Sequence, residues 1–153
     1  MRGDGSLERL RREGRIVVVG ASLAGLRAAE ALRDEGFAGA LTVIGDEPHE
    51  PYDRPPLSKQ VLLGRAAAGR TALPRLRAVD ATWRLGVAAS GLDMAAGLVR
   101  LADGDEVPYD RLLIATGVRA RPWPQEAEAE LDGVLHTTLR VRCRAVRGRG
   151  GRC

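Results

Sequence analysis

The sequence contains little cysteine, and this scarcity excludes two kinds of protein. Only Cys143 and Cys153 are present among 153 residues, and both lie near the C-terminal end. Their separation is not that of a zinc site, and two cysteines do not form the disulfide framework of a small secreted domain. We therefore expect neither a metal site nor a disulfide scaffold.

Long apolar runs are absent as well. The uncharged stretch at residues 16–26 has eleven residues, whereas a membrane-spanning helix needs about 20. A basic segment precedes this stretch, as in a signal peptide, but Asp4, Glu8 and Glu13 lie in the same segment and argue against export. We therefore expect a cytoplasmic protein that has no membrane partner.

Lysine is nearly missing, with Lys59 the only one. The formal net charge is +4, but residues 140–153 hold six arginines and no acid, so residues 1–139 hold eighteen basic and twenty acidic side chains. The positive excess belongs to the end of the chain and gives no reason to expect a nucleic-acid partner. We expect residues 137–153 to be a basic tail without a fold of its own. A shifted reading frame or truncation after about residue 140 would explain this composition, and a genuine basic interaction tail is the alternative.

What the sequence does contain is one strand–helix–strand unit at residues 15–47. Residues 16–19 are β-branched and uncharged, which predicts a strand buried on both faces. Apolar residues then recur near a period of 3.6 over residues 23–32, which predicts a helix that Gly36 ends. A second apolar run at residues 41–44 predicts another strand. Together these elements predict a βαβ unit.

The turn between the first strand and the helix is typical of a dinucleotide site. Gly20 permits the turn, and Gly25 lets the helix pack close to the sheet. Ser22 replaces the middle glycine of the G-x-G-x-x-G pattern. Unpaired N–H groups at the start of the helix would face a pyrophosphate. The predicted contact residues are Gly20, Ala21, Ser22, Leu23, Ala24 and Gly25.

An acid at the end of the second strand completes the pattern. Asp46 lies 21 residues after Gly25, where a carboxylate binds a ribose hydroxyl pair. Glu47 is the alternative for that role. Small residues at a strand–helix junction often serve packing alone, but with both strands, the helix and the acid present we predict an adenine dinucleotide site.

The remaining segments predict short connecting elements. Residues 1–14 are expected to be a loose leader or a frayed helix. The prolines of residues 48–59 exclude a helix before Pro56, after which Ser58 is expected to cap a short helix at residues 59–63 that Gly64 ends. Residues 98–101 and 106–109, joined by a turn, predict a β-hairpin. The apolar run at residues 112–115 predicts another buried strand.

Three segments resemble, in order, the FAD-dependent pyridine nucleotide oxidoreductases, and specifically their ferredoxin reductase branch (putidaredoxin, rubredoxin and dioxygenase-ferredoxin reductases). They are VVVGASLAGLRAAEAL at 17–32, GDEPHEPYDRPPLSK at 45–59 and VPYDRLLIATG at 107–117. PYDRPPLSK is the most specific. The resemblance implies a three-layer α/β, Rossmann-like FAD/NAD(P)-binding domain over residues 15–136, with a parallel sheet and a β-hairpin insertion.

The resemblance also implies FAD as the cofactor, with Asp46 on the adenosine ribose. It places Arg54 and Lys59 on the flavin side, with Lys59 near the isoalloxazine, whereas Arg54 in a charged loop would otherwise be read as a solvated residue. Ala89 matches a position that contacts adenine through its backbone. The chain is expected to pass the cofactor at Ala115, Thr116 and Gly117.

Two aromatic residues could also reach a cofactor ring. They are Tyr52 and Trp83, although packing is the commoner role of such residues. His49 and His136 have no acid–base partner that the sequence reveals.

The implied activity is an oxidoreductase reaction. In this family NAD(P)H passes a hydride to FAD, which releases single electrons to a ferredoxin-type iron–sulfur protein. Because the chemistry belongs to the flavin, no catalytic side chain is predicted.

The absence of cysteine between Asp46 and Lys59 separates this chain from relatives with a redox-active cysteine beside the flavin. No second Gly-rich unit for NAD(P)H follows, so we expect this chain alone to be inactive. The alternative function is a non-catalytic nucleotide-binding remnant or interaction module. The sequence gives no basis for an oligomeric state.

Overall fold

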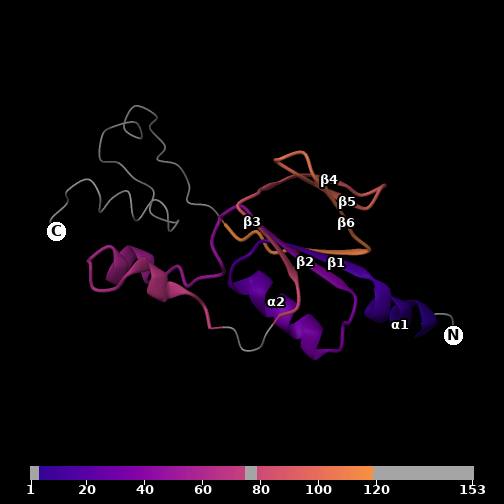
Figure 1. Ribbon diagram of the computed structural model, residues 1–153, viewed down its shortest axis with the longest axis horizontal. Coiled ribbons are helices and arrows are strands. Elements are labelled where there is room, and N and C mark those ends of the chain that lie inside the picture. Colours follow the sequence, from indigo (N-terminus) through magenta and orange to yellow (C-terminus); the bar gives the residue numbers. More distant parts are fainter. Residues whose placement is uncertain (1–3, 75–78, 119–153) are drawn as a thin grey trace. The chain divides into compact units, whose positions relative to one another are not determined.

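The computed structural model describes residues 4–74 and 79–118 (Figure 1). The chain divides into two compact units, one containing Met1–Pro51 and Pro74–Gly117 and the other Tyr52–Leu73 and Val118–Cys153. The expected basic tail at residues 137–153 lies outside the described residues. The elements of the first unit are α1 (Asp4–Glu13), β1 (Arg15–Val19), α2 (Leu23–Asp34), β2 (Ala40–Gly45), β3 (Thr82–Leu85), β4 (Ala89–Asp93), β5 (Leu98–Leu101), β6 (Glu106–Pro108) and β7 (Arg111–Ile114).

Four strands form a parallel sheet in the order β3-β2-β1-β7. In β1, Ile16 pairs with Leu41 of β2 on one side and with Arg111 of β7 on the other. The helix α2 connects β1 to β2, which is the crossover that two parallel strands need. This arrangement confirms the predicted βαβ unit and the α/β class.

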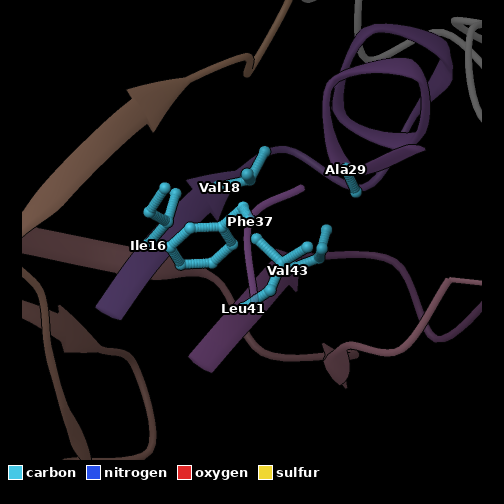
Figure 2. Close-up of a cluster of buried hydrophobic side chains, with 6 residues drawn as sticks. All are labelled: Ile16, Val18, Ala29, Phe37, Leu41 and Val43. Carbon is cyan, nitrogen blue, oxygen red and sulfur yellow. The ribbon is translucent and has the colours of Figure 1, made fainter. Parts of the chain in front are cut away.

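Successive side chains of the central strands point to opposite faces of the sheet, and both faces are covered. One face of β1 and β2 packs beneath α2, where six buried side chains meet (Figure 2). Burial of each large one contributes on the order of 1.5–3 kcal/mol. The six are Ile16, Val18, Ala29, Phe37, Leu41 and Val43.

A second, antiparallel sheet in the order β4-β5-β6 covers the other face. Val99 and Leu101 of β5 pack there against Val17 and Ile44. The hairpin turn closes with the Leu101 amide donating to the Asp105 carbonyl oxygen at 2.8 Å. Helix, parallel sheet and antiparallel sheet are therefore the three predicted layers (Figure 1), and the β5–β6 hairpin is confirmed.

The first segment of the chain forms a regular helix, α1, where the sequence allowed a loose leader or a frayed helix. Its carboxyl end is hydrogen-bonded to the loop before β2. The Arg11 carbonyl oxygen accepts from Ala38 (2.7 Å) and Gly39 (3.2 Å), and the Gly14 carbonyl oxygen accepts from Ala40 (2.9 Å). These hydrogen bonds fix the C-terminal end of α1, and the sequence pattern did not reveal them.

Strand β7 was expected to be buried, but within residues 4–74 and 79–118 it lies at the edge of the sheet. Among the described residues its only neighbour in the sheet is β1. Leu113 is 41% exposed and Ile114 is 65% exposed. Apolar composition predicted the strand correctly but could not predict its place in the sheet.

The described part of the second unit contains two short helices, a π-helix at Leu57–Val61 and a 3₁₀-helix at Ala68–Thr71. The first begins directly after Pro56, whose φ of −64° is already helical. The expected cap at Ser58 is therefore wrong, since Ser58 lies inside the helix. Gly64, with a φ of +75°, follows the helix as expected. None of the helices in the described ranges is long and apolar enough to cross a bilayer.

Candidate dinucleotide-binding site

Gly20 lies at the carboxyl end of β1, between the ends of two neighbouring strands. Its amide donates to the Ile44 carbonyl oxygen of β2 at 2.8 Å, and the amide of Ala115, just after β7, donates to the Val19 carbonyl oxygen at 2.7 Å. The φ of Gly20 is +122°, which L side chains rarely adopt. A Cβ at this position would also overlap the Ala115 carbonyl oxygen. Both the backbone conformation and the close approach require glycine.

Gly25, in the first turn of α2, meets a second steric requirement. A Cβ there would overlap the Gly20 carbonyl oxygen and lie 3.5 Å from a methyl group of Val18. The helix therefore sits directly against the turn, with its first residues at the carboxyl edge of the sheet. This contact is a packing role, and it also gives a dinucleotide the short strand-to-helix turn that it needs.

The positive end of the helix dipole at the start of α2 is not offset by a capping side chain or an acidic residue in the first turn. Ser22 is the N-cap residue, with extended backbone (φ −121°), and its carbonyl oxygen accepts from Leu26 at 2.9 Å. Its side chain makes no capping hydrogen bond, and the first turn contains no acidic residue. Leu23 and Ala24 are exposed. The free N–H groups and the helix dipole therefore favour an anion at this point.

The predicted acids follow β2 at the same edge. Asp46 is exposed and Glu47 is half-buried. The chain here is fixed by backbone bonds, because the Glu47 carbonyl oxygen accepts from Gly86 (3.0 Å) and the Gly45 carbonyl oxygen accepts from Val87 (3.1 Å). Both acidic residues thus directly follow β2, the strand that lies beside the Gly20 turn.

The parallel sheet brings most of the predicted residues to one edge. Because β1, β2 and β7 are parallel, their carboxyl ends carry the turn at residues 20–25, the acids and the segment Ala115, Thr116 and Gly117. Thr116 and Gly117 are exposed. Ala89 begins β4, soon after β3 ends at the same edge, and is also exposed.

Arg54 and Lys59 belong to the second unit, so their predicted place on the flavin side stays a prediction. Lys59 is exposed on the π-helix, and Arg54 is half-buried, with its carbonyl oxygen accepting from Leu57 at 2.9 Å. Tyr52 is buried against Leu57 and Val61, which supports its packing role.

Trp83 also has a packing role. It lies on β3 and packs against the cluster beneath α2. Within residues 4–74 and 79–118, no group of three or more His, Cys, Asp or Glu side chains could hold a metal ion.

Sequence reasoning missed one ion pair at the opposite edge of the sheet. Arg15, the first residue of β1, binds Asp110, the residue before β7, through two guanidinium nitrogens. These hydrogen bonds hold the pKa of Asp110 at about 2, below its usual value. The only signal in the sequence was the position of Asp110 inside the segment VPYDRLLIATG.

A βαβ unit with a Gly20 turn, an open helix start and an acid after the second strand defines a dinucleotide-binding α/β domain. The profile of the family described as "Pyridine nucleotide-disulphide oxidoreductase" matches residues 14–147. The chain belongs to this family.

Several similar proteins are named as ferredoxin reductases or their components. The chain is 41% identical over 114 residues to the biphenyl dioxygenase system ferredoxin–NAD(+) reductase component of Paraburkholderia xenovorans (strain LB400), which covers 69% of this chain and 26% of that protein. Putidaredoxin reductase, solved in a covalent complex with putidaredoxin, matches with a TM-score of 0.67 at 35% identity over 74% of this chain and 28% of its own. A ferredoxin reductase from Rhodopseudomonas palustris matches with a TM-score of 0.77 at 28% identity, over 90% of this chain and 34% of its own. The chain thus spans about a quarter to a third of the length of these proteins.

Proposed function

We propose that this chain is the FAD-binding portion of an NAD(P)H-dependent oxidoreductase that passes electrons through FAD to a ferredoxin-type iron–sulfur protein. The observation that carries the proposal is the convergence of the Gly20 turn, the start of α2 and the Ala115 segment at one edge of the sheet. The similar proteins are named as ferredoxin reductases, which supports the same class of partner here.

The residues of this edge suit the adenosine and pyrophosphate parts of FAD. The first N–H groups of α2 would donate to the pyrophosphate, and the hydroxyl of Ser22, which is not used as a cap, would donate beside them. The carboxylate of Asp46 would accept from the ribose hydroxyls, with Glu47 as the alternative. The backbone of Ala89 would contact adenine.

Other residues would hold the flavin half. The chain would pass it at Ala115, Thr116 and Gly117, and the resemblance to the family makes Arg54 and Lys59 further candidates for binding it. When bound, FAD supplies the hydride and electron chemistry. The chain's own part is to bind the group, orient it and limit the access of water.

A non-catalytic nucleotide-binding module is the second candidate. It is favoured by one observation: residues 4–74 and 79–118 contain a single Gly-rich turn between a strand and a helix, so FAD and NAD(P)H would compete for one unit. Such a module would bind only the adenosine diphosphate part that the two share.

Calorimetric titration of the chain with FAD and with ADP separates these candidates. Tighter binding of FAD than of ADP means contacts beyond the adenosine half and supports the flavoprotein proposal. Equal affinities favour the nucleotide module, and no binding of either ligand contradicts both.

The ribose role is tested by Asp46→Ala. Loss of hydrogen bonds to a charged acceptor should cost roughly 1.5–3 kcal/mol of binding free energy. The matched control is Asp80→Ala, which removes an exposed aspartate just before β3, at the opposite edge of the sheet, and should leave affinity unchanged. Unchanged affinity in Asp46→Ala would transfer the role to Glu47 or end it.

A further inference from the structure

Arg15 and Asp110 make more hydrogen bonds to each other than an ordinary surface ion pair does. The Arg15 amide donates to Oδ2 of Asp110 at 2.7 Å, and the Asp110 amide donates to the Arg15 carbonyl oxygen at 2.9 Å. The guanidinium adds Nε to Oδ2 at 3.2 Å and Nη2 to Oδ1 at 2.8 Å. Backbone and side chain of both residues are therefore joined at one point.

This point is where β1 and β7 begin to pair. The register places Ile16 opposite Arg111 and continues without a break to Val19 opposite Ile114. Four residues of strand span about 13 Å, and the next residues are Gly20 and Ala115. The ion pair and the candidate site therefore occupy the two ends of the same strand pair.

The site end has no room for a displaced strand. The Ala115 carbonyl oxygen fills the space where Gly20 would carry a side chain, and the Gly20 carbonyl oxygen fills the corresponding space at Gly25. A shift of β7 along β1 would move Ala115 away from the turn or into it. Since β1 is the only sheet neighbour of β7 among the described residues, no second strand there opposes such a shift.

We propose that Arg15 and Asp110 are positioning residues for the dinucleotide site: by fixing the start of β7 against β1, they place Ala115, Thr116 and Gly117 beside the Gly20 turn. This inference rests on the proposed function. We expect its main effect to be geometric and its contribution to stability to be small, because the side chains are 48% and 37% exposed and exposed ion pairs contribute little to folding.

The chain contains a control for the loss of an exposed ion pair. Arg100 also binds two carboxylates, Asp93 at 2.9 Å and Glu106 at 3.3 Å, and is 54% exposed. It joins strands of the antiparallel sheet and has no part in the β1–β7 pairing. A general effect of losing an exposed ion pair should therefore appear equally in Arg100→Gln.

The test uses the whole chain and compares Asp110→Asn with Arg100→Gln. ADP affinity is measured by calorimetry, and amide hydrogen exchange is measured at Ala115 and, as an internal reference, at buried Val43 of β2. In Asp110→Asn we expect about fivefold weaker ADP binding or more and faster exchange at Ala115, with exchange at Val43 unchanged. In Arg100→Gln we expect neither change.

Two results would overturn the inference. One is unchanged ADP affinity and Ala115 exchange in Asp110→Asn. The other is equal acceleration at Ala115 and Val43, which indicates a purely structural role. If Asp110→Asn fails to fold, Arg15→Gln decides by the same criteria, because it removes the guanidinium and leaves the carboxylate able to accept from the backbone amide of residue 15.

Failure of the proposed function would look different. In that case the unaltered chain would not bind ADP, whereas faster exchange confined to Ala115 in Asp110→Asn would still show that the pair positions this segment. Unchanged Ala115 exchange would reject the positioning role whether or not ADP binds.

Discussion

The carbonyl oxygen of Ala115 occupies the space that a side chain at Gly20 would need. These residues are far apart in sequence and stand side by side because β1 and β7 are parallel neighbours. The contact makes Gly20 the position in the site where a substitution has the most direct steric effect.

Gly20→Ala should therefore abolish ADP and FAD binding and lower the free energy of unfolding. Both an unfavourable φ of +122° and the overlap with Ala115 contribute, and we expect a loss of about 3 kcal/mol or more. Gly104→Ala is the control, because Gly104 has a φ of +93° but nothing within 4 Å of a Cβ. It should cost only about 1–2 kcal/mol. Urea denaturation measures both, and equal losses would show that the approach of Ala115 is not restrictive.

Ser22→Ala should weaken ADP binding without weakening the helix. An N-cap serine normally contributes about 0.5–2 kcal/mol through its side chain, but Ser22 makes no capping bond. We therefore expect a change below about 0.5 kcal/mol in the free energy of unfolding and a fall in ADP affinity from the lost hydroxyl. Ser22→Gly restores the middle glycine and should allow closer approach of the pyrophosphate. A large loss of stability in Ser22→Ala would mean that the hydroxyl serves the helix after all.

The chain alone should not oxidise NADH or NADPH, even with FAD supplied. Hydride transfer needs the nicotinamide held about 3–3.5 Å from the flavin, and FAD would occupy the one dinucleotide unit formed by the described residues. An assay with a dye acceptor should give rates no higher than free FAD. A clearly higher rate would reveal a nicotinamide site that neither sequence nor structure suggested.

The contribution of Asp110 to stability should depend on acid pH. Arg15 lowers the pKa of Asp110 to about 2 in the folded chain, below its value of about 3.9 in an unfolded chain. The stabilisation is therefore complete above about pH 4 and is lost as pH falls towards 2. Urea denaturation from pH 2 to 6 should show the difference between the unaltered chain and Asp110→Asn shrinking below pH 4. If the difference in unfolding free energy between the two chains stays constant from pH 2 to 6, the ion pair of Arg15 with Asp110 is contradicted.

Local patterns were enough to predict the central fold. The β-branched run before Gly20 and the 3.6-residue period after it are read from neighbouring residues, and they correspond to β1 and α2. The hairpin of β5 and β6 was equally local, because its turn lies between two short apolar strands. The site residues predicted in the first unit, from the Gly-rich motif and the family resemblance, lie together because parallel pairing brings strand ends to one edge.

Contacts between distant segments could not be predicted in the same way. Arg15 and Asp110 are 95 residues apart, and neither has an unusual local pattern. The edge position of β7 depends on which strands are present beside it, which composition does not reveal. The π-helix after Pro56 was misjudged because a serine in a polar loop was given more weight than the fixed φ of the proline.

The pairing of β1 with both β2 and β7 has a consequence for the order of folding. Residue 16 meets residue 41 across one edge and residue 111 across the other. Closing the longer loop costs more chain entropy, and contacts of long sequence separation form late. During synthesis, β1, α2 and β2 can assemble while β7 has yet to be made, so one edge of β1 stays open to pairing with other chains until then. We expect the nascent chain to be most prone to aggregation in this interval, before the carbonyl oxygen of Ala115 arrives beside Gly20.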